Sequence, residues 1–207
     1  MSNQFAFSFL LFIKMNALPT FIAVIGLAPL AILLFKASLE DINNRRIPNK
    51  LVLVGVLLGL TLNVLLPEGL GFNSLTPGGL GGLKSFQGLG LGLLMLMPMY
   101  LLQVMGAGDV KLMAMVGSFV GPSDLVGVFC ATLLIGGLIA CVVALRSKSF
   151  KKLIQNLKFI LIGSMVKICD GKLPLKVELP ISVGHLPYAV SISMGTVSFM
   201  IWQRLFA

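Results

Sequence analysis

Two aspartates, Asp41 and Asp109, have the surroundings most suited to chemistry in this chain of 207 residues. Asp41 lies in a polar stretch between two apolar runs, and Asp109 follows Gly106-Ala107-Gly108 within an otherwise apolar segment. Two carboxylates held together at a membrane edge cannot both ionise easily, because like-charge repulsion and desolvation disfavour the second charge. They share one proton, so the ionised partner activates water while the protonated one polarises a peptide carbonyl. This is aspartic-protease chemistry, which needs no metal, cofactor or nucleophilic side chain.

Each aspartate also has a simpler interpretation. A solvated loop carboxylate explains Asp41 taken alone. Asp109 has two alternatives, an ion pair with Lys111 or a cap at a helix N-terminus. Ionisable groups inside apolar segments are usually functional, however, and Gly106 and Gly108 leave the backbone open to a substrate strand. The Gly-Xaa-Gly-Asp sequence, with a second aspartate on the same side, therefore favours a catalytic pair.

Residues for other kinds of site are scarce. His185 is the only histidine and is interpreted as a loop residue near the membrane interface, so we expect neither a Ser-His or Cys-His system nor a histidine-rich metal site. Cys130, Cys141 and Cys169 are widely spaced without a CxxC pair, so they are interpreted as small apolar residues. The net charge is +9, but no basic patch interleaved with aromatics indicates nucleic-acid binding.

The composition is that of a membrane protein. Hydrophobic residues make up 57% of the chain and charged residues 11%, with a mean hydropathy of +1.01. A soluble domain needs more polar residues to cover its surface. We therefore expect a single polytopic, all-α domain over residues 1–207, without a removed signal peptide.

Six apolar segments are expected to cross the bilayer, since a helix of about 20 residues spans its hydrocarbon core. The expected spans are 18–36, 51–66, 86–105, a short segment over 112–120 that begins at or before Asp109, 125–145, and 186–206. The expected connections are a polar loop over 38–50, a Gly-rich loop over 67–84 and a turn at 121–124. Residues 153–168 have helical amphipathic spacing and predict a helix on the cytoplasmic membrane surface. Residues 5–13 are interpreted as an extra interfacial segment.

The basic residues set the expected orientation. With the N-terminus outside, all but three of the sixteen Lys and Arg residues lie on the cytoplasmic side, the exceptions being Lys14, Lys84 and Arg204. Asp41 and Asp109 then lie at similar depth on the cytoplasmic face. The basic run over 146–152 is interpreted as a topology signal that contacts anionic lipid.

Some local features carry structural expectations. Pro48 should stop the preceding helix, and Asn49 should cap the next one. Small residues let helices approach closely in lipid, which is the expected role of three glycines in the third span, Gly88, Gly90 and Gly92. Tyr188 is interpreted as an aromatic side chain at the membrane interface.

Three motifs resemble the type IV prepilin peptidase family. The segment 106–111 resembles its GxGDxK motif, and Asp41 followed by Arg46-Ile47-Pro48-Asn49 resembles its first catalytic aspartate and the sequel. Residues 186–189, Leu-Pro-Tyr-Ala, are similar to the start of its final helix. The resemblance implies an intramembrane aspartic peptidase whose catalytic pair is Asp41 and Asp109, with three supporting motif residues, Gly106, Gly108 and Lys111.

The same resemblance implies a substrate and a location. The substrate is a prepilin or pseudopilin, a hydrophobic helix with a basic leader, cut at the cytoplasmic face of the inner membrane. Longer relatives carry an N-terminal domain with paired CxxC zinc motifs that methylates the product. This chain has no such motif and resembles the short, peptidase-only branch found with tight-adherence (Flp) pili, so we expect cleavage without methylation.

Two rival functions remain open. One is another GxGD protease, similar to presenilin or signal peptide peptidase, although those have their first aspartate within a helix, and Asp41 is expected in a loop. The other is a small transporter that uses Asp109 as a proton or cation site. Such a transporter requires polar groups near the bilayer midplane, and the spans offer almost none.

Overall fold

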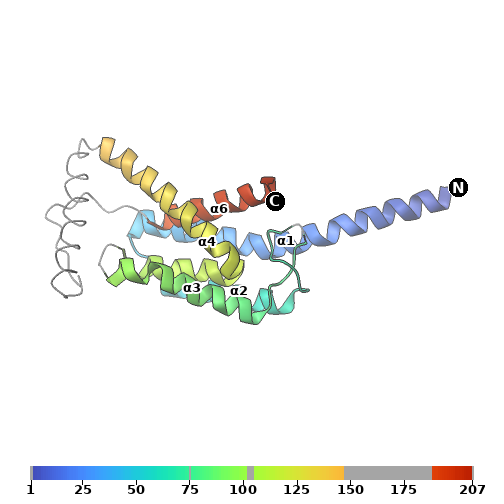
Figure 1. The fold of residues 1–207 in the computed structure, drawn as a ribbon, viewed down its shortest axis with the longest axis horizontal. Coiled ribbons are helices and arrows are strands. Elements are labelled where there is room, and N and C mark those ends of the chain that lie inside the picture. Colours follow the sequence, from blue (N-terminus) through green and yellow to red (C-terminus); the bar gives the residue numbers. More distant parts are fainter. Residues whose placement is uncertain (1, 75, 102–104, 147–187, 207) are drawn as a thin grey trace.

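The computed structural model describes residues 2–74, 76–101, 105–146 and 188–206, and its regular elements in these ranges are all helices (Figure 1). These are α1 (Ser2–Asn44), α2 (Asn49–Leu65), α3 (Gly82–Leu101), α4 (Ala107–Arg146) and α6 (Tyr188–Phe206). The expected all-α fold is therefore confirmed. Two segments, Phe21–Asn44 and Ala107–Val143, are long and apolar enough to cross a membrane. The expected surface helix over 153–168 and His185 lie outside the described residues.

Helix α4 consists of two helical parts. Gly121 has φ 75° and ψ 177°, a backbone conformation that interrupts the helix and suits glycine. The chain turns back there, so that both ends of α4 lie at the same end of the bundle (Figure 1). The expected turn is thus present, but Gly121 alone provides the break and helix resumes at Pro122.

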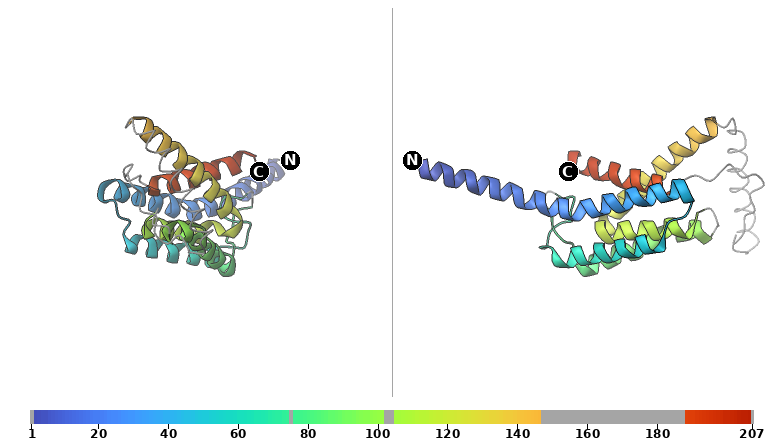
Figure 2. Two further views of the ribbon diagram at one scale, coloured as in Figure 1. Left: turned by 60° about the vertical axis from the view of Figure 1, so that its left-hand side comes forward. Right: turned by 180° about the vertical axis from the view of Figure 1, so that it is seen from behind.

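The helical segments alternate in direction, and their ends gather at two ends of the bundle. One end, here called the site end, holds the C-terminus of α1 and the N-termini of α2, α4 and α6 (Figures 1 and 2). The opposite end holds the α2–α3 connection, the Gly121 turn and the C-terminus of α6. The N-terminal part of α1 extends beyond the other helices at this opposite end (Figure 2).

Helix α1 differs most from expectation, because it continues through polar residues to Asn44. The segment 38–44 contains no Gly or Pro, and its side chains bond within the helix: Ser38 Oγ donates to the Leu34 carbonyl and Asn44 Nδ2 to Glu40 Oε2. The helix ends where Arg45 takes φ 52°. The expected loop is therefore wrong for residues 38–44, and Asp41 lies on a helix. Residues 5–13 are likewise part of α1 and not a separate segment.

Helix α2 matches the expected second span closely, but its start differs in detail. Its N-cap is Pro48, with φ −63° and ψ 126° and no side-chain capping bond. The expected capping of α2 by Asn49 is therefore wrong. No helix runs through Pro48, as expected, but α1 ends before it is reached, at Asn44.

Helices α3 and α4 are in close contact through glycine. A Cβ atom on Gly88 would overlap the carbonyl oxygen of Gly117, and one on Gly92 would lie 2.7 Å from that of Met113. A Cβ atom on Gly90 would meet nothing within 4 Å. The expected packing role is thus confirmed for Gly88 and Gly92 and wrong for Gly90.

The first part of α4 forms the centre of the core. It packs against α3 and α2, and five of its apolar side chains are completely buried: Leu112, Met113, Met115, Val116 and Phe119. Burial of this face fixes the rotation of α4 about its axis, and with it the direction in which the first turn presents Asp109.

Candidate active site

The structure brings Asp41 and Asp109 to one open cavity of about 380 Å³ at the site end. Asp41 lies in the last turn of α1 and is half-buried, whereas Asp109 lies in the first turn of α4 and is 8% exposed. Their carboxyl groups are close enough for their charges to interact. The remaining lining residues are Arg45, Arg46, Ile47, Asn49, Gly106, Ala107, Gly108 and Lys111.

Asp109 is held by the start of its own helix. Its backbone N–H donates to the Gly106 carbonyl at 3.2 Å, while the Gly106 N–H donates to Asp109 Oδ2 at 3.3 Å. The bond from the Gly106 N–H to the Asp109 carboxyl group is the half of a capping box that the third helical residue supplies; Gly106, as the N-cap, has no side chain for the other half. The capping alternative is therefore present, and it orients the same carboxyl group that lines the cavity.

Lys111 has a partner on another helix. Its Nζ donates to Asn49 Oδ1 at 3.1 Å, which links the first turns of α4 and α2. The expected motif residue is thus joined to the segment that follows Asp41. This contact, and not an ion pair with Asp109, is the hydrogen bond that the structure gives to Lys111.

The two motif glycines have different surroundings. A Cβ atom on Gly108 would lie 3.3 Å from Cβ of Ile47, so the connection between α1 and α2 packs tightly against α4 at this point. Gly106 is exposed, and its nearest contact would be Asp109 Oδ2 at 3.5 Å. Gly108 therefore serves helix packing, whereas Gly106 leaves open space above the carboxyl group of Asp109.

Helix α6 also reaches the site, through residues that the sequence alone assigned no chemical role. The Ala189 N–H donates to Asp41 Oδ2 at 3.1 Å. Tyr188, interpreted above as an interface aromatic, is half-buried and close enough to Asp109 for the carboxylate charge to act on its phenol. The Leu-Pro-Tyr-Ala motif was the only sequence signal for this contact, since a backbone N–H has no side-chain signature.

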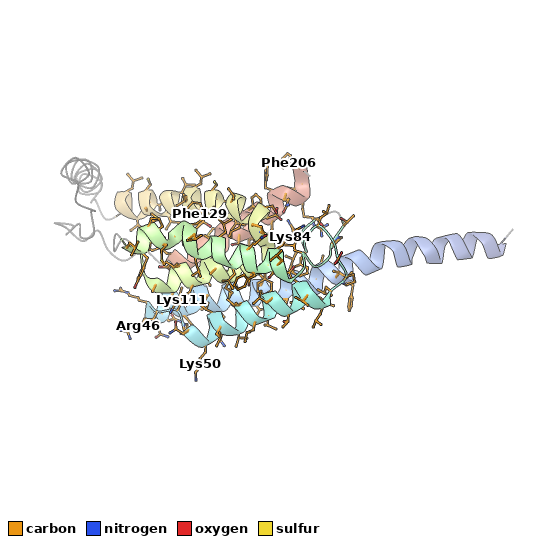
Figure 3. The ribbon with its side chains drawn as sticks, turned by 60° about the horizontal axis from the view of Figure 1, so that its bottom comes forward. Arg46, Lys50, Lys84, Lys111, Phe129 and Phe206 are labelled. Atoms are coloured by element: carbon orange, nitrogen blue, oxygen red, sulfur yellow. The ribbon has the colours of Figure 1, made fainter. Side chains whose placement is uncertain are left out.

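Cationic side chains surround the acidic pair. Arg45 and Arg46 line the cavity, and Figure 3 shows Arg46, Lys50 and Lys111 at one end of the bundle, with Lys84 and Phe206 toward the other. Within the ranges that the structure describes, no three His, Cys, Asp or Glu side chains lie where they could hold a metal ion together. The two carboxyl groups that share the cavity can carry out acid–base chemistry.

A comparison with protein families adds independent information. The sequence profile of the type IV leader peptidase family matches residues 28–141, more than half of the chain, and the match includes Asp41 and Asp109. The chain belongs to this family. It is therefore a peptidase of the type IV leader class, a membrane-embedded family whose substrates are prepilin-like. No curated protein and no solved structure matches the chain. The family match ends at residue 141, before α6 begins. The hydrogen bond between Ala189 and Asp41 in this peptidase is therefore known from the structure and not from the family match.

Proposed function

We propose that this peptidase is an intramembrane aspartic endopeptidase that removes the leader of prepilins or pseudopilins, of the Flp type. The observation that carries the proposal is the meeting of Asp41 and Asp109 in one cavity at the site end. The two residues come from helices that lie far apart in the sequence, and the matched family is one of leader peptidases.

The proposed mechanism uses one proton shared by the pair. The ionised carboxylate takes a proton from water as the water oxygen attacks the scissile carbonyl carbon, and the protonated carboxyl group gives its proton to the carbonyl oxygen. Collapse of the tetrahedral intermediate breaks the C–N bond and transfers a proton to the leaving amine. Gly106 and Ala107 are exposed beside Asp109, which leaves room for an extended substrate backbone.

We further propose that six helical segments cross the inner membrane, with the N-terminus outside and the site end at the cytoplasmic face. Arg45, Arg46, Lys50 and Lys111 at the site end support this orientation, because basic residues concentrate on the cytoplasmic side. In this arrangement residues 1–207 form one polytopic domain. They contain no paired CxxC motif, so the activity we propose for them is cleavage without methylation.

The structure bears differently on the two rival functions, another GxGD protease and a transporter. The helical placement of Asp41 removes the sequence argument against a protease similar to signal peptide peptidase, so the family match to leader peptidases is what favours our proposal. A transporter needs polar groups near the bilayer midplane. Among the described residues, the buried side-chain amide of Asn63, 1% exposed, is occupied by hydrogen bonds to the Gly59 and Ser118 carbonyls and from the Leu80 N–H, so it offers no free group to a cargo ion.

The test is leader removal from a co-expressed model prepilin, followed as a mobility shift on a gel and then with purified protein. We expect Asp41→Asn and Asp109→Asn each to lower cleavage by about a thousandfold or more, because either change removes a member of the acid–base pair. Both variants should still insert into the membrane.

Asp124 provides a matched control for this experiment. It is a half-buried aspartate at the opposite end of the bundle, where its Oδ2 accepts a hydrogen bond from Gln203. Asp124→Asn should cleave at close to the wild-type rate. Wild-type cleavage by either Asp41→Asn or Asp109→Asn, with purified protein, would refute the proposed function.

A further inference from the structure

The first turn of α6 contacts α1 at the residue proposed for catalysis. The first N–H groups of a helix have no partner within it, and they need an acceptor from elsewhere. In α6 the Ala189 N–H finds this acceptor in Asp41 Oδ2, at 3.1 Å. The bond engages one carboxyl oxygen of a side chain that also lines the cavity. It therefore restricts how the Asp41 carboxyl group can rotate.

A second polar contact joins the same two helices one turn deeper. The hydroxyl oxygens of Ser38 and Ser193 lie 2.8 Å apart, in hydrogen-bond distance. Ser38 precedes Asp41 by one turn, and Ser193 follows Ala189 by one turn, with its Oγ 2.8 Å from the Ala189 carbonyl oxygen. The two contacts thus form consecutive layers across the α1–α6 boundary.

The contact between Ser38 and Ser193 sets the position of α6 relative to α1 along the helix axes. The proton of each hydroxyl group has a backbone acceptor on α1 as well as the partner serine within reach, because the Leu34 carbonyl oxygen lies 2.9 Å from Ser38 Oγ and 3.2 Å from Ser193 Oγ. One serine therefore donates to the other, which in turn donates to a carbonyl oxygen. A small displacement of α6 along α1 breaks these contacts. The same displacement removes the Ala189 N–H from Asp41, because both contacts are carried by the same helix.

We propose that the first turn of α6 positions Asp41 for catalysis. The Ala189 N–H turns Oδ2 toward α6 and leaves the other carboxyl oxygen for the cavity, and the Ser38–Ser193 pair keeps the two helices in the register that this bond requires. Ala189, Ser38 and Ser193 are positioning residues, because they act through Asp41. This inference rests on the proposed function of Asp41.

The direct test removes the N–H group. Ala189→Pro deletes the donor within the first turn of α6, where a helix tolerates proline. Val190→Pro is the matched control, since it imposes a similar backbone restriction one residue later and leaves the Ala189 N–H in place. We expect kcat for prepilin cleavage to be about 10- to 100-fold lower in Ala189→Pro than in Val190→Pro, with a KM within about twofold. Equal kcat values in the two proline variants would overturn the proposal.

The serine pair gives a second test that does not depend on proline being tolerated. Ser38→Ala and Ser193→Ala should each lower kcat severalfold, and the double variant should be no worse than the poorer single one, because the two side chains act as one contact. Ser193→Thr keeps a hydroxyl and should restore most of the loss. Additive losses, or no rescue by threonine, would contradict the positioning role.

The outcomes separate this inference from the proposed function. If Asp41→Asn cleaves normally, Asp41 is not catalytic and the proposed function fails first. If Asp41→Asn is inactive while Ala189→Pro matches its control and the serine variants match the wild type, the proposed function stands and the role of α6 is wrong.

Discussion

At the residue scale, the two carboxyl groups are held in different ways. Asp109 is oriented by Gly106 at the start of its own helix, and Asp41 by Ala189 at the start of a different one. The hydrogen bond that the structure shows for Lys111 goes to Asn49 and not to either carboxyl group. The motif around Asp109 therefore combines orientation of the carboxyl group with attachment of α4 to the α1–α2 connection.

This attachment can be tested at Lys111. Lys111→Met keeps the length of the side chain but removes the donor to Asn49, so the α1–α2 connection beside Asp41 loses one anchor. We expect initial rates of leader cleavage to fall about tenfold, a loss typical of a broken hydrogen bond to a charged group. Lys50→Met is the control, an exposed lysine at the same end whose side chain does not line the cavity (Figure 3). Similar rates in both variants would mean that the bond has no part in catalysis.

At the element scale, the close contact of α3 and α4 supports the site. The first part of α4 is the most buried segment of the described residues, and glycine on α3 lets the two backbones meet. In lipid, helices associate through such close packing, because apolar side chains gain little by leaving the lipid tails. The position of Asp109 thus depends on residues of α3 that never touch the cavity.

Two glycines of α3 give a matched pair for this idea. Gly88→Ala places a methyl group against the Gly117 carbonyl, so overpacking should destabilise the protein by about 1–3 kcal/mol. Gly90→Ala meets open space, and alanine favours helix, so it should be neutral or stabilising by up to about 1 kcal/mol. Thermal unfolding in detergent checks both. A lower Tm for Gly90→Ala than for Gly88→Ala would contradict this view of the interface.

At the scale of the whole molecule, the alternation of helix direction brings the ends of four helices together. The last turn of α1 and the first turns of α2, α4 and α6 all lie at the site end, and each carries a residue of the network around the two aspartates (Figures 1 and 2). Between Asp41 and Asp109 the chain passes along the bundle twice, through α2 and α3, and so returns to the same end. A single pass would have placed the two aspartates at opposite ends.

The proposed orientation predicts which ends a reagent can reach. In a background without Cys130, Cys141 and Cys169, a single cysteine at Lys50 should react with a membrane-impermeant maleimide only in inverted vesicles. A single cysteine at Lys84 should react only in vesicles with the outer face exposed. Labelling of both positions from the same side would exclude the six-span arrangement.

The all-α class of the protein and the bounds of several helices could be predicted from the amino-acid sequence alone. Long apolar runs predict helices because their length matches the bilayer, and this is why α2 and α6 begin and end close to where they were expected. The end of α1 was wrong for a local reason: polarity was interpreted as a loop, yet residues 38–44 contain nothing that breaks a helix. The two aspartates could be proposed as a catalytic pair from the sequence because ionisable groups are rare in such a chain.

The surroundings of those two aspartates could not be predicted without the three-dimensional structure. The contact between Ala189 and Asp41 joins residues 148 positions apart, and that between Lys111 and Asn49 joins residues 62 apart. The Leu-Pro-Tyr-Ala motif marks the region of Ala189 but not its partner, since a backbone N–H has no side-chain signature, and Asn49 was interpreted as a helix cap. Such contacts follow from how α1, α2, α4 and α6 pack against one another, and packing depends on the whole chain.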